Sequence, residues 1–335
     1  MSGVQKRIVT RDEDGQRVDR WFFRQFPDVP KSHFYKLCRK GQMRLDSKRI
    51  KPGSRLKEGM EIRIPPLKSE AGPGRKTLPA GAADITFFKS LVLYDDGDVL
   101  ALNKPSGLAV QGGTNTNYYL DAFLHIFNDE QGVTPRLVHR LDKQTSGVLL
   151  LARSADAARG LGQSLKTRQV EKLYWALTSP APEHNTGEIN IPINKAGGID
   201  KKMMQVDPDT GKSAKTHFDV IDTAGKDYAF VRFRPHTGRT HQIRVHAAFS
   251  KLPIIGDTHY GGLETPDKIF GTSDTPVQDR LYLHARRIIA PHPVKDENID
   301  ITAPLSKADK ALWEILGFDS EYKEAVSDSR PDLDG

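Results

Sequence analysis

The sequence is poor in cysteine and has no long apolar stretch. Its 335 residues include one cysteine, Cys38, which excludes an internal disulfide and a thiolate cluster for zinc or iron–sulfur binding. No apolar run approaches the roughly 20 residues that cross a bilayer, and residues 1–16 are polar, unlike a secretory signal. We therefore expect a protein that stays in the reducing cytoplasm and makes no contact with a membrane.

Motifs for a metal or a nucleotide are also missing. His241 and His246 stand five positions apart, which is not the i, i+4 spacing of helical zinc ligands. Residues 209–213 end like a phosphate-binding loop, but Val206 occupies the place of that loop's first glycine. We predict that the protein needs no metal and no cofactor.

Charge is unevenly distributed along the chain. Residues 1–68 hold 18 Lys+Arg and 8 Asp+Glu, so their net charge is 18 − 8 = +10, whereas the whole chain carries +7. A basic lobe attracts a phosphate backbone, because each neutralised phosphate releases condensed counterions. Charge alone leaves a second interpretation open, which is a merely solubilising surface.

Two helices are predicted within this basic segment. Val18, Trp21, Phe22 and Phe26 follow the spacing of one helical face. A second helix is expected to start at an N-cap, Ser32, and to end at Gly41, with Phe34, Leu37 and Cys38 facing inward. Short strands are expected at residues 43–45 and 61–64, with a turn at Asp46 and Ser47. The basic side chains that we expect to contact RNA are Arg17, Arg20, Arg24, Lys31, Lys36, Arg39 and Lys40.

Composition divides the chain into four parts. Residues 1–66 form the basic module, and residues 17–64 of it resemble the small RNA-binding domain named after a ribosomal small-subunit protein. Residues 67–84 are rich in Gly, Pro and Ala, which predicts a flexible linker before a catalytic domain at residues 85–317. Residues 318–335 are acidic and are expected to form a disordered tail.

An aspartate lies between two apolar runs of the catalytic part. Residues 99–102 predict a buried strand, a second apolar run ends at Asp142, and residues 147–152 begin a third. Asp142 is therefore predicted to lie on a loop between buried strands, where reactive groups are often held. An aspartate there can equally cap a turn or pair with an arginine.

Four motifs together resemble the RluA-type pseudouridine synthase family. They are NKPSG at 103–107, HRLDKQTSG at 139–147, EKLYWA at 171–176 and GRTHQIRVH at 238–246. The resemblance implies an α+β fold, in which a mainly antiparallel mixed-sheet catalytic domain follows a small N-terminal α/β RNA-binding domain. It also implies a catalytic role for Asp142, a base-stacking role for Tyr174 and an ion pair between Arg244 and Asp142.

The implied reaction suits these residue types. Uridine must lose its glycosidic bond at N1 and rejoin the sugar at C5, so the site must hold two fragments and exclude water. A carboxylate acting as nucleophile or base must be ionised, and a nearby guanidinium favours the charged form. The resemblance implies that Arg140 fills the gap left by the flipped nucleotide, and we expect Ile243 and Leu283 to form the pocket wall.

Purely structural roles for two of these residues remain open. Tyr174 alternates with its neighbours along a strand and could belong to the core, and Arg244 could be a surface charge on a helix capped by Thr240.

Residues 109–113 are most similar to the branch that modifies large-subunit ribosomal RNA, although Gln111 replaces the histidine often found there. We expect a monomeric enzyme acting on that RNA. The alternatives are a transfer-RNA synthase and a non-catalytic RNA-binding protein of ribosome assembly.

Overall fold

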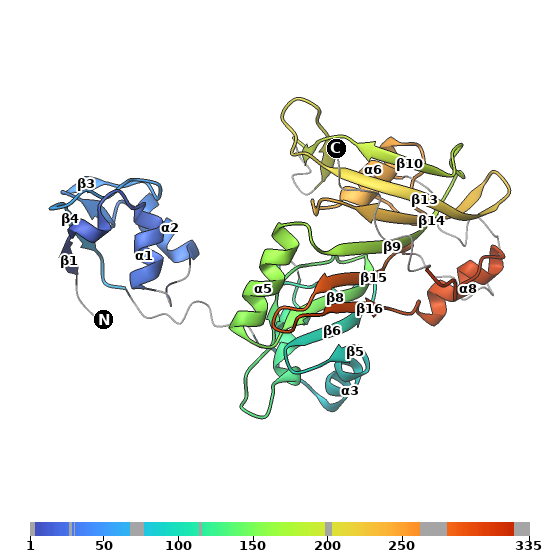
Figure 1. Ribbon diagram of the computed structural model, residues 1–335, viewed down its shortest axis with the longest axis horizontal. Helices are drawn as coiled ribbons and strands as arrows, with labels where there is room; N and C mark the ends of the chain where they lie inside the picture. The colour runs from blue at the N-terminus through green and yellow to red at the C-terminus, as the bar shows by residue number, and fades with distance from the viewer. Residues whose placement is uncertain are drawn as a thin grey trace. The chain divides into compact units, whose positions relative to one another are not determined.

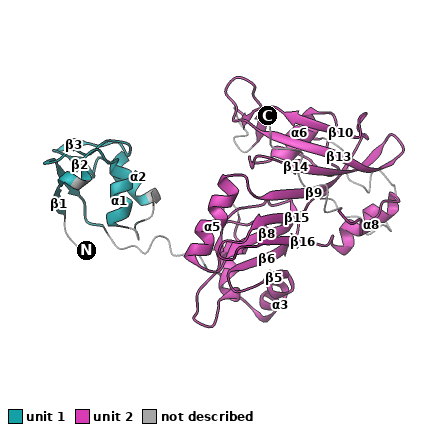
Figure 2. Cartoon of the chain, viewed as in Figure 1, with its two compact units in different colours: residues 1–77 teal, residues 78–335 magenta. Residues whose placement is uncertain are grey.

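The computed structural model describes residues 4–26, 29, 31–67, 77–113, 116–197, 203–261 and 280–324. The chain divides into two compact units, Met1–Thr77 and Leu78–Gly335 (Figure 2). Each unit has its own sheet and its own buried clusters, so each is described by itself. We call them the N-terminal unit and the catalytic unit.

The N-terminal unit packs two helices against a small antiparallel sheet. The helices are α1 (Val18–Gln25) and α2 (Lys31–Arg39), and the strands β1 (Gln5–Ile8), β2 (Arg44–Leu45), β3 (Lys48–Arg49) and β4 (Glu61–Ile64) follow the order β1-β4-β2-β3. Asp46 and Ser47 join β2 to β3 with φ of 46° and 65°, so the predicted turn is confirmed. The sequence analysis missed β1, because all but one of its residues are exposed and main-chain pairing with β4 defines it.

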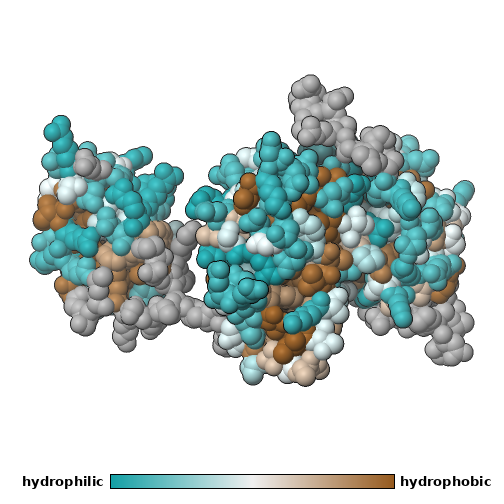
Figure 3. Space-filling model, turned by 60° about the horizontal axis from the view of Figure 1, so that its bottom comes forward, coloured by the Kyte–Doolittle hydropathy of each residue, from teal (hydrophilic) through white to brown (hydrophobic). Residues whose placement is uncertain are grey.

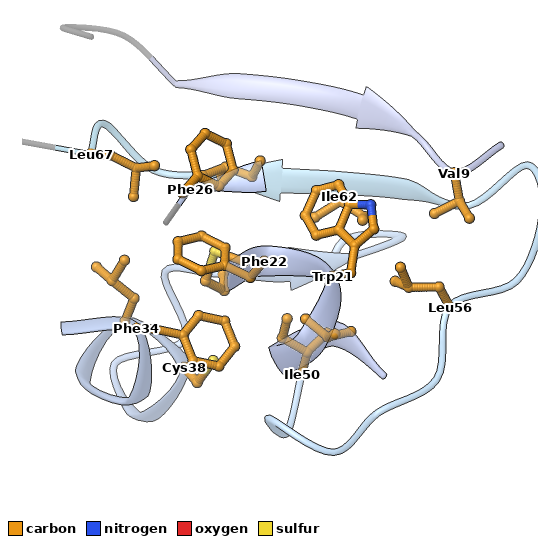
Figure 4. Close-up of a cluster of buried hydrophobic side chains, with 14 residues drawn as sticks. Val9, Trp21, Phe22, Phe26, Phe34, Cys38, Ile50, Leu56, Ile62 and Leu67 are labelled. Atoms are coloured by element: carbon orange, nitrogen blue, oxygen red, sulfur yellow. The ribbon is translucent and has the colours of Figure 1, made fainter. Parts of the chain in front are cut away.

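The apolar faces predicted for the two helices form the core of this unit (Figure 4). Trp21 and Phe22 of α1 are buried, and Phe22 meets Phe34 of α2 with the two ring centroids 4.6 Å apart. The indole nitrogen of Trp21 donates a hydrogen bond of 2.7 Å to Glu13 Oε1, so its one polar atom is satisfied. The helical spacing therefore predicted this core correctly.

One large mixed sheet forms the centre of the catalytic unit (Figure 1). Its main path is β10-β13-β14-β9-β15-β8-β6-β5, with β16 paired to β15 and β7 paired to β8. Among the pairings of the described strands, β8 and β15 run parallel and the others antiparallel. This confirms the predicted α+β fold with a mainly antiparallel sheet.

The strand bounds on that path, in chain order, are β5 (Val92–Asp95), β6 (Val99–Lys104), β7 (Arg136–Leu137), β8 (Ser146–Ala152), β9 (Glu171–Thr178), β10 (Thr186–Asn190), β13 (Lys215–Ala224), β14 (Tyr228–Pro235), β15 (Leu283–Pro291) and β16 (Asn298–Thr302). A separate small hairpin pairs β11 (Ile193–Lys195) with β12 (Met204–Val206).

Helices cover both faces of this sheet because its central strands are apolar on both sides. Along β6, Leu100 and Leu102 pack with Phe88 of α3 (Ala82–Ser90) and with the segment that contains α4 (Leu120–Phe123). The alternate residues Val99 and Ala101 pack with Leu161 of α5 (Ala155–Lys166). At the other end of the sheet, α6 (Gln242–Phe249) covers one face and α8 (Lys307–Ile315) the other. Both faces of central strands such as β6 and β8 are thus withdrawn from water.

The predicted borders of the linker and the tail need correction. The backbone N–H of Leu78 donates to the carbonyl of Ala122, and Leu78 packs on the catalytic core, so the catalytic unit begins within the predicted linker. Phe318 is buried, and Glu324 binds the indole of Trp175 and the guanidinium of Arg232. Residues 318–324 therefore belong to the folded unit, and residues 325–335 lie outside the described residues.

The surface of the catalytic unit is mixed. In the view of Figure 3, hydrophilic residues cover much of its visible face, with hydrophobic residues exposed between them. Large exposed apolar side chains of this unit include Ile85, Phe87 and Val92, and folded proteins commonly carry such residues. None of the described helices combines the length and the apolar character that crossing a bilayer requires.

Candidate active site

Asp142 lies on the loop between β7 and β8, and a buried lysine fixes that loop. The ammonium of Lys104 is fully buried and donates to the carbonyls of Pro105, Leu108 and Lys143 at 2.9, 2.9 and 3.2 Å. Burial lowers the pKa of Lys104 to about 7, while the charge of Asp142 opposes that shift. The lysine thereby ties the turn after β6 to the residue next to Asp142.

Further hydrogen bonds hold the same loop from both sides. The hydroxyl of Ser106 donates to the carbonyl of Gln144 at 2.7 Å, and the N–H of Gly107 donates to that of Lys143 at 2.9 Å. His139 accepts the N–H of Leu150 at 2.9 Å, and burial lowers the pKa of His139 to about 3, so its ring is neutral. Asp142 therefore lies on a loop that hydrogen bonds hold in place from both sides.

Gly147 allows the close strand approach behind this loop. Its φ is +107°, and a Cβ added there would lie 2.2 Å from the carbonyl oxygen of Ala285 in β15. Gly147 and Ala285 are partners in the parallel pairing of β8 and β15. A residue without a side chain is required at this position.

A pocket of about 520 Å³ opens beside Asp142. It is bordered by the Asp142 loop, the end of α5, β9, β15 and the segment from Pro235 to Arg244. The six side chains predicted for catalysis and substrate contact all line it: Arg140, Asp142, Tyr174, Ile243, Arg244 and Leu283. The structure thus brings together residues that are up to 143 positions apart (283 − 140).

Aromatic and apolar groups line part of this pocket. Tyr174 of β9 packs with the cluster that contains Phe123 and with the one that contains Ile243. Burial raises the pKa of the Tyr174 hydroxyl, and the charge of Asp142 raises it further, so the phenol stays neutral. Ile243 and Leu283 are buried and border the same space. This lining suits a flat base.

The predicted ion pair between Asp142 and Arg244 is wrong in this structure. Arg244 forms a bidentate pair with Asp257, with distances of 2.8 Å from Nε and 2.7 Å from Nη2. Burial alone would lower the pKa of Arg244, but the carboxylates of Asp257 and Asp142 raise it above its ordinary value. Asp257 therefore occupies the Nε–Nη2 edge of the guanidinium, and no ion pair joins Arg244 to Asp142 among the described residues.

Among the described residues, the basic group within ion-pair distance of Asp142 is a histidine. His241 Nε2 lies 3.8 Å from Asp142 Oδ2. Helix α6 begins after His241, whose side chain makes no capping hydrogen bond, so the expected cap at Thr240 is also wrong.

Positive charge dominates the remaining lining of the pocket. Asp142 is its one acidic residue, whereas the cations are Arg140, Lys166, Arg168, Lys172, Arg239 and Arg244. Lys172 precedes Tyr174 by two residues on β9, so both lie on one face of the strand. Burial lowers the pKa of Lys172, and no hydrogen-bond acceptor or carboxylate of the described residues contacts its ammonium. Such a pocket favours an anionic ligand.

Potential metal ligands lie elsewhere or are already engaged. Asp96, Asp98 and His292 form one group, but Asp96 Oδ2 already accepts from His292 at 2.7 Å and from Lys295 at 2.8 Å. The ring nitrogens of His246 lie 2.9 Å from Thr216 Oγ1 and 3.0 Å from the carbonyl oxygen of Ile191. We assign no metal to these residues.

The basic side chains predicted to bind RNA in the N-terminal unit are mostly free in solvent. Arg20, Arg24, Lys36, Arg39 and Lys40 are exposed. Arg17 is also exposed but forms an ion pair of 2.7 Å with Asp19. The side chain of Lys31 lies outside the described residues.

Sequence reasoning missed three residues of the site: Lys104, Lys172 and His241. For Lys172 a signal was present, because alternation along a strand places it on the same face as Tyr174. Lys104 carried no such signal, since only the folded turn shows three carbonyls converging on its ammonium. His241 was weighed as a metal ligand and stands in the motif at 238–246, but it was given no role at the site.

Comparison with known proteins gives a consistent result. Residues 98–249 match the family described as RNA pseudouridylate synthase. The chain is 36% identical over 314 residues to a protein of Escherichia coli (strain K12) named ribosomal large subunit pseudouridine synthase C, covering 92% of this chain and 95% of that protein. A Vibrio parahaemolyticus protein of the same name is 35% identical over 313 residues, covering 92% of this chain and 96% of its own.

Solved structures agree with the sequence matches. Human RNA pseudouridylate synthase domain containing 4 superposes with a TM-score of 0.58 and 29% identity, covering 69% of this chain and 95% of its own. Human RNA pseudouridylate synthase domain containing 1 gives a TM-score of 0.51 and 27% identity, covering 66% and 86%.

Proposed function

Since the chain belongs to the RNA pseudouridylate synthase family, we propose that it converts specific uridines of large-subunit ribosomal RNA to pseudouridine. The enzyme class follows from the family, and the RNA target rests on relatives that are named for the large ribosomal subunit. The same proposal places its action in the cytoplasm, where that RNA is met.

The observation that carries the catalytic proposal is a single carboxylate in a pocket whose other charged side chains are cations. Unstacking a uridine from the RNA costs a few kcal/mol of free energy. Stacking of the base on an aromatic face such as Tyr174 offsets about 1–3 kcal/mol of this. The cations of the pocket attract the phosphates of the flipped nucleotide. We propose that Asp142 then acts at the sugar, as a nucleophile or as a base.

The other site residues have supporting roles in this proposal. Ile243 and Leu283 exclude water from the two fragments while the base turns, and exclusion of water prevents their hydrolysis. Arg140 is exposed at the pocket border, where it can occupy the space that the flipped nucleotide vacates. Arg244, held by Asp257, adds positive charge next to the reacting carboxylate.

The target is tested by pseudouridine mapping of total RNA from cells with and without the gene. We expect sites in large-subunit ribosomal RNA to be lost, and to return with the wild-type gene but not with Asp142→Asn. If sites are lost only in transfer RNA, the substrate is transfer RNA and the proposed reaction still holds. No lost site in any RNA would favour the non-catalytic alternative.

Replacing Lys172 with methionine tests the pocket cations. The ammonium has no partner among the described residues, so a phosphate of the RNA is the group that we expect to pair with it. Lys172→Met should weaken RNA binding and lower the slope of log K against log salt concentration by about 1. The matched control is Lys226→Met, an exposed lysine outside the pocket. Equal salt slopes for the two variants would exclude the phosphate contact.

Removing charge from the N-terminal unit tests its proposed role in RNA binding. Arg20, Arg24, Lys36, Arg39 and Lys40 are exposed, so glutamine at all five positions should leave the buried core of this unit unchanged. We expect weaker binding and a salt slope lower by up to about 4, measured by titration at several salt concentrations. An unchanged slope would show that this unit contacts no phosphates.

A further inference from the structure

His241 has an unusual backbone conformation at the pocket. Its φ is 54° and its ψ is 19°, in the left-handed region, directly before the first residue of α6. A non-glycine residue in this region costs about 1 kcal/mol or more, and such strain persists where surrounding contacts enforce it. The conformation is therefore a reason to ask what the side chain contacts.

One side of the imidazole is fixed by Tyr260. His241 Nδ1 lies 2.7 Å from the Tyr260 hydroxyl oxygen, and that oxygen also accepts the backbone N–H of Met204 at 2.9 Å. The Tyr260 hydroxyl can donate its one hydrogen to Nδ1 while its oxygen accepts from Met204. In this arrangement, on which the proposal below builds, Nδ1 accepts and a neutral imidazole carries its proton on Nε2.

The other side of the imidazole faces Asp142. Nε2 lies 3.8 Å from Asp142 Oδ2, and both residues line the pocket. Burial lowers the pKa of His241; Asp142 and Asp257 oppose this shift, whereas Arg244 and His259 add to it. A lowered pKa favours a neutral ring near pH 7, and with Nδ1 accepting from Tyr260 the Nε2–H faces the carboxylate.

The guanidinium expected to orient Asp142 is committed elsewhere. Nε and Nη2 of Arg244 donate to Asp257, and among the described residues no hydrogen bond or ion pair joins Arg244 to Asp142. The Arg244 Cζ atom lies 5.0 Å from the centre of the Tyr260 ring. Tyr260 therefore contacts both Arg244 and His241, so Asp257, Arg244, Tyr260 and His241 form one connected support. His241 is the member of it that reaches Asp142.

We propose that His241 is a positioning residue whose Nε2–H donates to Asp142 Oδ2 when RNA occupies the pocket. The proposal rests on the catalytic role proposed for Asp142. A gap of 3.8 Å exceeds a hydrogen bond, and catalytic hydrogen bonds are often long before the substrate binds and then shorten. A neutral donor fixes the orientation of the carboxylate and withdraws less charge from it than an ion pair would.

The test uses the full chain and an unmodified large-subunit ribosomal RNA transcript under single-turnover conditions. His241→Leu removes the donor and should lower the rate by roughly 10–100-fold at saturating enzyme. His241→Gln places an amide N–H near the position of Nε2 and should bring the rate within about threefold of wild type. RNA affinity should change little in either variant, because the contact is made to Asp142.

A wild-type rate for His241→Leu would overturn the proposal, as would equal loss in the leucine and glutamine variants. Asp142→Asn in the same assay separates the two proposals. If that variant stays active, the role of Asp142 is wrong; if it is inactive while His241→Leu is normal, only the positioning role fails.

A second measurement reports on the wild-type contact itself and uses a variant only to assign the signal. Nitrogen-15 spectra of the histidine-labelled wild-type chain report which ring nitrogen carries the proton. We expect His241, assigned by its absence from the His241→Gln spectrum, to be protonated at Nε2 and unprotonated at Nδ1. A proton on Nδ1 in the neutral ring would overturn the proposal.

Discussion

Asp142→Asn should reduce pseudouridine formation by at least about 10³-fold, because an amide can neither attack the sugar nor accept its proton. The change is isosteric. Within the described part of the chain, the Asp142 side chain makes no hydrogen bond, so the fold does not depend on one. Thermal unfolding and RNA affinity should therefore stay close to wild type, since phosphate contacts supply binding. The rate is measured in single-turnover assays with saturating enzyme.

Asp296→Asn is the matched control for this loss. Asp296 is exposed in the turn between β15 and β16 and carries the same charge away from the pocket. We expect its activity to equal that of wild type. An Asp142→Asn variant as active as this control would show that catalysis lies with another group.

Gly147→Ala should destabilise the catalytic unit by about 4 kcal/mol or more. The new methyl group would lie 2.2 Å from the carbonyl oxygen of Ala285, and the backbone φ of +107° is unfavourable for alanine. The strands β8 and β15 would have to separate at their parallel pairing, behind the loop that carries Asp142. The midpoint of thermal unfolding should fall by roughly 10 °C or more.

Gly97→Ala separates the steric clash from the backbone strain. Gly97 also has a positive φ, +90°, but nothing lies within 4 Å of a Cβ added there. It should cost only about 1 kcal/mol, which is the strain alone. If the two variants lose equal stability, the close approach of Ala285 is not what requires glycine at position 147.

Local sequence patterns were enough to predict most of the fold. Helical spacing identified the buried faces of α1 and α2, because tertiary packing follows the same 3.6-residue period. Apolar runs identified β6 and β8, since both faces of these strands are buried. The edge strand β1 escaped because its side chains are mostly exposed, so no apolar alternation marks it.

The motifs located the pocket, but the partners inside it depend on the folded chain. Asp257 lies on a loop after α6. The residues next to it in the sequence do not indicate that Asp257, and not Asp142, would form the ion pair with Arg244. The left-handed conformation of His241 follows from tertiary contacts with no local glycine or turn signal. Likewise, composition suggested disorder at Glu324, although its carboxylate binds two buried donors.

The place of β15 in the sheet has a consequence for synthesis of the chain. This strand lies between β9 and β8. It begins 105 residues after the end of β9 (283 − 178) and 131 residues after the end of β8 (283 − 152). Until it emerges from the ribosome, β8 and β9 lack the strand between them and the pocket lacks Leu283. A nascent chain can therefore fold its N-terminal unit early, but it completes the active site only after β15 has been made.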